Sequence, residues 1–296
     1  MASIVRQKPL RRMPEGLLAG SHPTPTQLAE LSHLGVDGCV LDGVLSRVEC
    51  EACVHAAEEA GFSFWDPEGA DEEKRRLRNA DTLEFMGEEL CSALYERLRP
   101  FVAHRVQITD EQPRFEPDLE GAWEALGLNP HVLINRYGEG GHFAPHADGS
   151  TQLSFDGRSL YTVLLYLNDC SDGGATLILR DEQTAATTTA EDGAAIARPE
   201  SVLYAVDPKA GRAVIYWHQT IHAGERVGAG SHKYCLRSDV MYERVPKACV
   251  TPQDLEAYEL YQRARELEAS GATMDALHLF MRCRKLSKTI ARAYRL

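Results

Sequence analysis

Between His131 and Tyr242 the sequence breaks into short apolar runs, and this pattern limits the fold more than any other feature of the chain. Clusters of glycine, proline, asparagine and aspartate separate the runs, as is typical of turns between strands. The runs are HVLINRY, FAPHAD, YTVLLYL, ATLILR, SVLYAV, AVIYW and YCLRSDVMY. Many short strands at this spacing indicate a sandwich or barrel rather than a parallel sheet.

The segment before the β-rich region is expected to be largely helical. We predict helices over Pro23–Leu34, after the capping box of Ser46 and Glu49, and over about 86–102. In a capping box the two side chains bind backbone donors that the first helical turn leaves free. The charged run at 71–82 mixes acids with bases, which favours a solvated loop over a nucleic-acid patch.

After Val250 the pattern becomes helical again and resembles one tetratricopeptide-like helical hairpin. A single repeat of this kind cannot bury its own apolar face. We therefore favour helices packed against the core over a peptide-binding module, and the hairpin is also a candidate surface for a protein partner. The residues with this spacing are Leu260, Ala264, Leu267, Gly271, Ala276, Phe280, Cys283 and Leu286.

The chain is predicted to have three parts within an α+β fold whose core is mainly β. Residues 1–22 form a mobile basic arm, residues 23–245 one domain with its β core at about 131–243, and residues 250–296 the helical hairpin. A length of 296 residues allows one substantial core with a small appendage. The low-complexity segment 181–200 is expected to be a loop and is a candidate lid.

The charge balance argues against a nucleic-acid substrate. The chain has 44 acidic and 32 basic residues, for a formal net charge of -12. An acidic protein lacks the positive field that supplies most non-specific affinity for nucleic acids. We therefore expect a protein, peptide or small-molecule partner.

Cysteine usage and the N-terminus predict the compartment. The eight cysteines are scattered, and a chain of this size does not need a disulfide framework. The first residues carry several bases but no apolar core of a secretory signal, and no apolar run approaches the roughly 18 residues that a membrane span needs. A cytoplasmic or nuclear protein is expected, although a short basic segment also fits an organellar presequence.

One stretch carries an H-x-D triplet, His146-Ala147-Asp148. Side chains alternate along a strand, so His146 and Asp148 point to the same side. A third metal ligand must come from elsewhere, and the run Trp217–Gly224 offers His218 and His222. Two imidazoles and one carboxylate on an iron(II) ion leave three positions open. Those positions suit a bidentate 2-oxo acid together with dioxygen.

The order of motifs around this triplet resembles the prolyl 4-hydroxylase-type family of Fe(II)- and 2-oxoglutarate-dependent oxygenases. A tyrosine precedes the triplet, and YLND, GGAT, W-x4-H and then a lysine and an arginine follow it. The resemblance extends from about Cys39 to Glu243, roughly two thirds of the chain. It implies a double-stranded β-helix, or jelly-roll, supported by N-terminal helices.

The resemblance also implies roles for individual residues. The iron ligands of the family fall on His146, Asp148 and His222. Its cosubstrate-anchoring base falls on Lys233, with Arg237 as the alternative on the same strand face. A cation there would pair with the far carboxylate of 2-oxoglutarate. The tyrosines that the family has near the cosubstrate fall on Tyr137 and Tyr166, and Thr176 is expected to line the pocket.

Other residues near these motifs have competing interpretations. His142 and His218 each precede a proposed ligand by four residues. They are alternative ligands, but we favour a place in the pocket or beside the ligands. Cys235 lies between Lys233 and Arg237 and is expected to point to their side of the strand, without a catalytic role.

The expected function is hydroxylation of an unactivated C–H bond by a 2-oxoglutarate-dependent dioxygenase. The resemblance implies iron(II), 2-oxoglutarate and dioxygen, and adds ascorbate (vitamin C) as a candidate reductant. It points to a prolyl residue of a cytosolic or nuclear protein as the substrate, with a free amino acid or another small molecule as the rival. A hypothesis of another class is a catalytically degenerate scaffold that recruits partners through the C-terminal helices.

Overall fold

The structure is a computed structural model that describes residues 11–18, 23–111, 116, 118–180 and 182–296. The chain forms two compact units, each built from segments that are far apart in the sequence. Unit 1 contains the described residues up to Val102 together with Gly127–Ser150 and Leu160–Val240. Unit 2 contains Ala103–Leu126, Thr151–Ser159 and Met241–Leu296.

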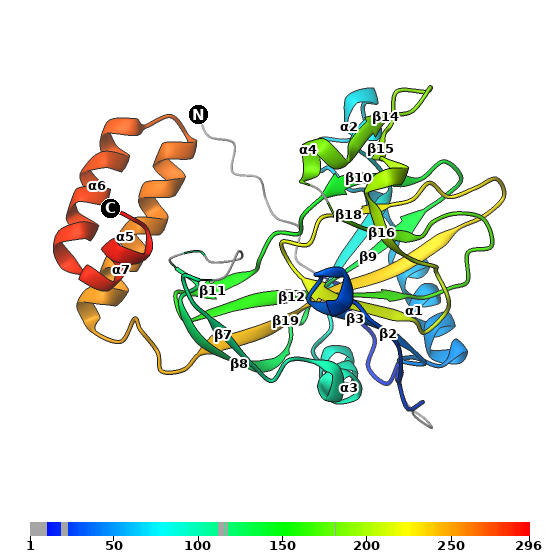
Figure 1. Cartoon of the computed structure of the whole chain (residues 1–296), viewed down its shortest axis with the longest axis horizontal. Coiled ribbons are helices and arrows are strands. Elements are labelled where there is room, and N and C mark those ends of the chain that lie inside the picture. Colours follow the sequence, from blue (N-terminus) through cyan, green and yellow to red (C-terminus); the bar gives the residue numbers. More distant parts are fainter. Residues whose placement is uncertain (1–10, 19–22, 112–115, 117, 181) are drawn as a thin grey trace. The chain divides into compact units, whose positions relative to one another are not determined.

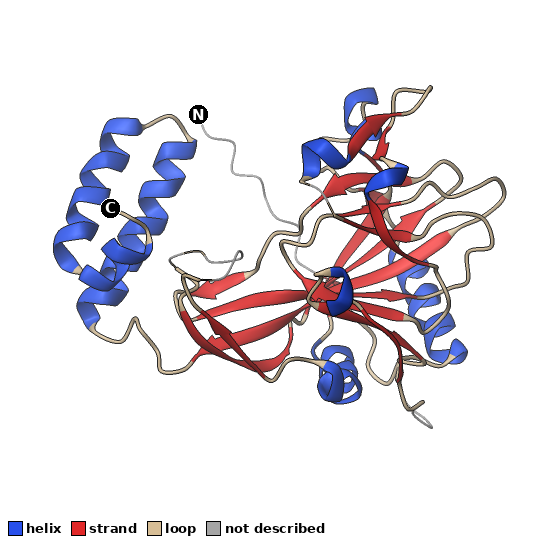
Figure 2. Cartoon of the chain, viewed as in Figure 1, coloured by secondary structure: helices blue, strands red, loops and turns tan. Residues whose placement is uncertain are grey.

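A large sheet forms one side of unit 1, and strands make up most of the unit (Figure 2). It continues through β12 and β19, which contribute residues to both units. In spatial order its strands are β1 (Arg11–Arg12), β6 (Asp81–Met86), β9 (His131–Tyr137), β19 (Lys233–Arg244), β12 (Gly157–Tyr166), β17 (Ala213–Trp217), β3 (Gly38–Asp42) and β2 (Thr26–Glu30). The short β4 (Ser63–Phe64) pairs with β6.

A smaller sheet of five strands completes unit 1 (Figure 1). In spatial order its strands are β16 (Val202–Val206), β13 (Thr176–Leu179), β18 (His222–Gly224), β10 (His142–His146) and β5 (Arg78–Asn79). Apart from β5, the strands of the smaller sheet come from the region predicted to be β-rich, and this region also supplies β9, β12, β17 and β19 of the large sheet. Two sheets of mainly antiparallel strands confirm the expected jelly-roll class.

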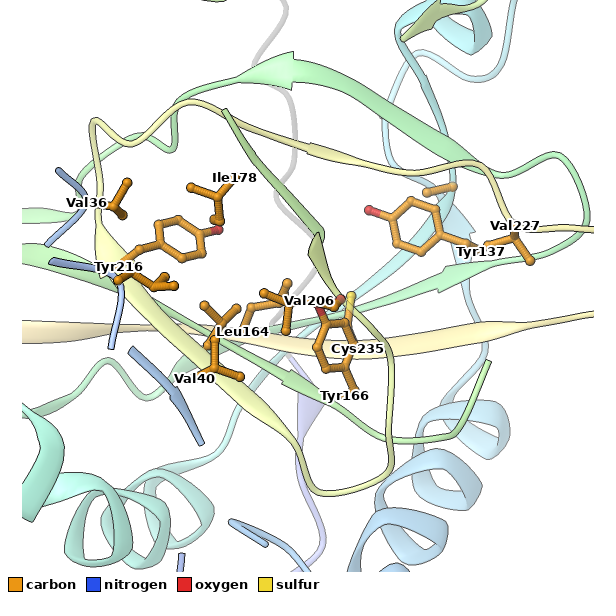
Figure 3. Packing of buried hydrophobic residues seen from close by; sticks show 13 residues of the cluster. Val36, Val40, Tyr137, Leu164, Tyr166, Ile178, Val206, Tyr216, Val227 and Cys235 are labelled. Atoms are coloured by element: carbon orange, nitrogen blue, oxygen red, sulfur yellow. Dashed lines mark hydrogen bonds between the residues drawn. The ribbon is translucent and has the colours of Figure 1, made fainter. Parts of the chain in front are cut away.

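The core of unit 1 lies between the two sheets, as the side chains in Figure 3 show. Leu164 and Tyr166 alternate along β12 and both join this core. Ile178 and Val206 reach it from the smaller sheet, on β13 and β16. Because alternate residues of a strand face the same side, each sheet presents one apolar face to the other.

Two helices of unit 1 were predicted from the sequence. Helix α1 (Arg47–Ala60) begins at the predicted capping box, in which Glu49 N donates to Ser46 Oγ and Ser46 N donates to Glu49 Oε2. Helix α3 (Glu88–Leu98) lies within the predicted range 86–102. A buried ion pair of 2.7 Å between Glu49 and Arg97 joins the two helices.

Two sequence predictions for the N-terminal region are wrong. Pro23–Leu34 is not one helix, because β2 pairs with β3 and only Ser32–Leu34 forms a short 3₁₀ helix. The charged run at 71–82 is not a loop, because it forms α2 (Glu72–Leu77) followed by β5. Asp71 caps α2 by accepting a hydrogen bond from Lys74 N. In both places pairing or capping by neighbours outweighed the local composition.

The low-complexity segment after β13 contains regular structure. Helix α4 (Gln183–Ala186) is followed by a hairpin of β14 (Thr187–Thr189) and β15 (Ala195–Ala197). This part of the segment is therefore not an irregular loop, and its role as a lid stays a prediction. Asp181 lies outside the described residues.

Unit 2 contains β7 (Arg105–Ile108), all but the last two residues of its hairpin partner β8 (Gly121–Leu128), the short β11 (Gln152–Ser154) and three helices. The helices are α5 (Pro252–Ala269), α6 (Thr273–Leu286) and α7 (Lys288–Ala293), drawn in orange to red in Figure 1. The aromatic ring of Phe155 contacts Tyr258 and Tyr294 edge-on, at centroid distances of 5.8 and 6.0 Å.

Asp156, in the turn between β11 and β12, binds the start of the C-terminal segment. Its buried carboxylate accepts hydrogen bonds from Ala248 N, Cys249 N and Arg244 Nε, at 3.0, 2.9 and 2.9 Å. The C-terminal helices are thus packed against other parts of unit 2. Whether they also bind a partner stays a prediction, as do the predicted domain boundaries.

The predicted N-terminal arm is described only in part. Residues 1–10 and 19–22 of the predicted arm lie outside the described residues, and Arg11–Arg12 form β1. In the part of the chain that the structure describes, no helix has the length and apolar character to span a bilayer.

Candidate active site

His146, Asp148 and His222 come together in unit 1, although the third is far from the first two in the sequence. His146 ends β10 and His222 begins β18, and the two residues are direct partners in this antiparallel pair. Asp148 lies two residues after the end of β10. One potential ligand atom from each of the three side chains lies within 4.8 Å of the others. The predicted triad is therefore assembled in space.

Backbone hydrogen bonds orient both imidazole rings. His146 Nδ1 lies 2.8 Å from Ala144 O, and His222 Nδ1 lies 3.0 Å from Thr220 O. A carbonyl oxygen only accepts, so Nδ1 carries the hydrogen in each ring and Nε2 keeps a lone pair. The Nε2 atoms of His146 and His222 lie 3.9 and 3.7 Å from the Asp148 carboxylate. Both rings therefore present a metal-binding nitrogen toward the carboxylate.

Burial keeps the histidines neutral, which is the form that binds a metal. It lowers the pKa of His146 to about 3 and also lowers the pKa of His222. Burial alone would raise the pKa of Asp148. The adjacent His222 ring and the Arg237 guanidinium outweigh burial and hold this pKa well below its usual range. The site thus combines two neutral imidazoles with one carboxylate.

Two further side chains contact Asp148 and were missed by the sequence interpretation. Thr162 Oγ1 donates to Asp148 Oδ2 at 2.7 Å, and Tyr216 Oη donates to the same oxygen at 3.2 Å. Tyr216 Oη also lies 3.0 Å from His222 Nε2. Thr162 and Tyr216 lie on strands that were predicted, β12 and β17. The only available signal was their position on an inward-facing side, because neither belongs to a motif.

A pocket of about 260 Å³ opens beside the triad. The strand β19 contributes Lys233, Cys235 and Arg237 to its wall, in agreement with strand alternation. Its wall also includes the predicted residues Tyr137 and Thr176. Tyr166 lies behind this wall, where its hydroxyl donates to Thr176 Oγ1 at 2.6 Å.

Lys233 is buried, and within the described residues its ammonium forms no ion pair. It is the cross-strand neighbour of Tyr137, and its Nζ lies 5.1 Å from the centroid of the Tyr137 ring and 5.5 Å from that of Tyr166. No hydrogen bond or ion pair of Nζ occurs among the residues that the structure describes. Burial lowers the pKa of Lys233. A buried ammonium that lies over two aromatic rings and forms no ion pair among the described residues is suited to receive an anion.

The alternative anchor, Arg237, is already engaged. Its Nε lies 3.4 Å from Asp148 Oδ1, and its Nη2 lies 3.2 Å from Asp239 Oδ1. Arg237 is therefore placed to hold the carboxylate of the triad, whereas Lys233 is left to bind a ligand.

The two alternative histidine ligands lie outside the triad. His142 sits between two carbonyl oxygens, those of Gly140 and Arg76, at 3.1 and 3.2 Å. His218 Nδ1 lies 3.0 Å from Thr162 Oγ1, which in turn binds Asp148. These contacts place His218 beside the ligand set, as favoured from the sequence.

The buried neutral histidines predict how stability depends on pH in the metal-free protein. The pKa is about 3 for His146 and about 4 for His218, whereas an unfolded histidine has a pKa near 6.5. Below pH 6.5 the unfolded chain therefore binds more protons than the folded protein. The free energy of unfolding should fall between pH 6.5 and about 4, by up to about 1.4 kcal/mol per pH unit for each histidine.

Urea unfolding at pH 7, 6 and 5 measures this dependence. The variant His146→Gln should show a shallower decline, because it lacks one of the buried imidazoles. Equal free energies of unfolding at pH 7 and pH 5 in the unsubstituted protein would contradict the prediction.

The donor set fits iron(II). Two imidazole nitrogens and one carboxylate oxygen are the ligands of non-haem iron sites that keep open positions for substrates. The pocket beside the triad supplies space for such ligands, and Lys233 adds a positive charge to its wall. A closed structural site would instead need a fourth protein ligand, and none is grouped with these three among the described residues.

Comparisons with known proteins agree with this geometry. Residues 132–238 match the model of the 2OG-Fe(II) oxygenase superfamily. The match includes all three residues of the triad together with Lys233 and Arg237. No curated protein matches the chain.

Several solved structures are similar to the chain at low identity. The viral collagen prolyl hydroxylase of Paramecium bursaria Chlorella virus-1 is 18% identical over 70% of this chain and 96% of that chain, with a TM-score of 0.41. A prolyl-4-hydroxylase of Pseudomonas putida is 17% identical over 72% and 96%, with a TM-score of 0.40. A prolyl hydroxylase of Trichoplax adhaerens, solved with a hypoxia inducible factor fragment, is 17% identical over 69% and 82%, with a TM-score of 0.42.

Proposed function

Because the chain belongs to the 2OG-Fe(II) oxygenase superfamily and is a 2-oxoglutarate-dependent dioxygenase, we propose that it hydroxylates a prolyl residue of a cytosolic or nuclear protein. The observation that carries the assignment of the site is a metal-binding triad beside a buried, unpaired lysine in one pocket. The order of motifs in the sequence, which is that of prolyl 4-hydroxylases, supports the prolyl substrate.

Each side chain of the site has a defined task in this proposal. His146, Asp148 and His222 would hold the iron, and Thr162 and Arg237 would fix the orientation of the Asp148 carboxylate. Bound iron, with 2-oxoglutarate as the source of electrons, would activate dioxygen for oxidation of an unactivated C–H bond.

The cosubstrate would lie between the triad and Lys233. The Lys233 ammonium would bind the far carboxylate of 2-oxoglutarate, with Tyr137 and Thr176 forming the adjacent wall. The Tyr166 hydroxyl would fix Thr176 through their hydrogen bond. The apolar part of the pocket wall, which includes Phe143 and Leu164, would limit the access of water to the reacting groups. Ascorbate as the reductant stays a prediction.

Mass spectrometry of candidate substrates tests the prolyl assignment. The iron-loaded protein is incubated with 2-oxoglutarate and proline-containing peptides, and with matched peptides in which alanine replaces the proline. We expect a gain of one oxygen on proline only, coupled to succinate formation. Oxidation of a free amino acid, with no oxygen on any prolyl peptide, would contradict the prolyl assignment and leave the oxygenase class in place.

A further inference from the structure

A second cation faces the pocket in addition to Lys233. Arg78 lies on β5, opposite Phe143 of β10, and lines the pocket. Its guanidinium carbon lies 4.7 Å from the centroid of the Phe143 ring and 5.5 Å from that of Trp65. The Phe143 ring stacks on His146, with a centroid distance of 3.6 Å and an interplanar angle of 18°. One aromatic ring therefore separates Arg78 from a proposed iron ligand.

The guanidinium of Arg78 is held by neutral groups. Its Nη2 donates to Asn135 Oδ1 at 2.6 Å and to Thr82 Oγ1 at 3.0 Å. Its Nε is buried without a hydrogen-bond partner. Among the described residues no carboxylate forms an ion pair with Arg78. Burying an unpaired charge costs free energy, and a bound anion reduces this cost. Arg78 is therefore suited to bind an anionic ligand.

Other arginines of unit 1 show what is missing here. Arg97 pairs with Glu49, Arg136 with Asp81, and Arg212 with Asp42, all within 2.8 Å. Among the described residues, by contrast, the Arg78 guanidinium contacts an amide, a hydroxyl and two aromatic rings. The rings and the two hydrogen bonds fix its orientation without neutralising its charge. The guanidinium therefore has a fixed orientation, and its charge is available to a ligand.

The cosubstrate does not supply an anion for both unpaired cations. The proposed function, on which this step rests, assigns one carboxylate of 2-oxoglutarate to Lys233 and the other to the metal. Arg78 is then left for another molecule in the same pocket. An arginine binds a carboxylate through two parallel N–H donors, which fixes both position and direction.

We propose that Arg78 binds a carboxylate of the substrate and thereby places the C–H bond to be oxidised. The same chemistry fits the α-carboxylate of a free or C-terminal proline derivative and the acidic side chain of a residue next to the proline. A substrate without this negative charge leaves the guanidinium unpaired and binds more weakly. Arg78 is on this proposal a residue that determines specificity.

Two matched pairs of probes separate these sources of the carboxylate. The first pair is N-acetylproline and N-acetylprolinamide, and the second is acetyl-Pro-Asp-amide and acetyl-Pro-Asn-amide. Calorimetry measures their binding to the Mn²⁺- and 2-oxoglutarate-loaded protein, and succinate formation is measured on the iron form. We expect the carboxylate-bearing member of one pair to bind about 30-fold or more tightly than its amide, as for other desolvated charge pairs.

The variant Arg78→Gln should abolish this preference and leave the affinity for 2-oxoglutarate within about threefold. Arg78→Lys should restore part of the preference, because it keeps the charge but not the paired donors. Arg75→Gln is the matched control, since Arg75 also stacks on an aromatic ring, Phe64, but does not line the pocket. Thermal unfolding verifies that each variant is folded, and Arg78→Lys replaces Arg78→Gln if the latter is not.

The outcomes distinguish this inference from the proposed function. If the wild-type protein binds both members of each pair equally, or binds none of them, the inference is wrong although succinate is still formed. If Arg78→Gln loses 2-oxoglutarate binding as strongly as Lys233→Gln does, Arg78 is an anchor of the cosubstrate and the inference is also wrong. If the wild-type protein makes no succinate with iron, the proposed function fails and this inference fails with it.

Discussion

His146→Ala is expected to lose both the binding of a divalent ion and the formation of succinate from 2-oxoglutarate. The ring of His146 directs Nε2 toward Asp148 while Nδ1 is held by Ala144 O, so alanine removes a ligand that no neighbour can replace. Replacing residues that merely support a ligand typically lowers metal affinity or activity 10- to 100-fold, and loss of a ligand should exceed about 100-fold. Calorimetric titration with Mn²⁺ and a succinate assay measure the two effects.

His218→Gln and His55→Ala are the controls for this prediction. His218 contacts Thr162 beside the triad, so its replacement should lower the affinity for Mn²⁺ by no more than about 10- to 100-fold. His55 lies on the exposed face of α1, far along the chain from the triad, and its replacement should change neither measurement. The assignment of ligands would be wrong if His218→Gln abolished Mn²⁺ binding while His146→Ala retained it.

Lys233→Gln is expected to raise the KM for 2-oxoglutarate by at least about 30-fold. Removing one partner of a buried, hydrogen-bonded charge pair typically costs about 2–5 kcal/mol of binding free energy. The affinity for Mn²⁺ should change much less, because Lys233 is not part of the triad. The KM comes from succinate formation, and direct binding of 2-oxoglutarate to the Mn²⁺-loaded protein verifies it.

Arg237→Gln is the matched control, and the structure predicts the opposite pattern for it. Arg237 contacts Asp148 and Asp239, so its replacement should lower the affinity for Mn²⁺ more than the affinity for 2-oxoglutarate. If the KM for 2-oxoglutarate rose more in Arg237→Gln than in Lys233→Gln, Arg237 and not Lys233 would be the anchor of the cosubstrate. Stability gives a further difference: Lys233→Gln removes a buried cation that forms no ion pair with any described residue, so the free energy of unfolding without ligand should not fall.

The triad could be predicted because its geometry follows from local rules. Strand alternation places His146 and Asp148 on one side, and the motif order identified His222. Alternation along β19 also predicted that Lys233, Cys235 and Arg237 share the pocket wall. Such features require only that a segment is a strand and that one of its faces is buried.

Other parts of the site depend on which strands become neighbours, and local patterns do not encode this. Tyr216 contacts the triad because β17 and β18 bring two inward faces together, and Arg78 reaches the pocket because β5 pairs with β10. Arg78 belongs to a charged run that looks like a solvated loop. The prediction of a helix at β2 was wrong for a related reason: the segment has a helical pattern, but it pairs with β3 as a strand.

Unit 2 imposes an order on folding during synthesis. Its residues come from the middle of the chain and from its last segment, and Asp156 contacts the backbone of Ala248 and Cys249 only after they have been made. A ribosome releases the N-terminal parts first, at roughly 5–20 residues per second. The ring of Phe155 must therefore wait, without its aromatic neighbours, for the final helices to emerge.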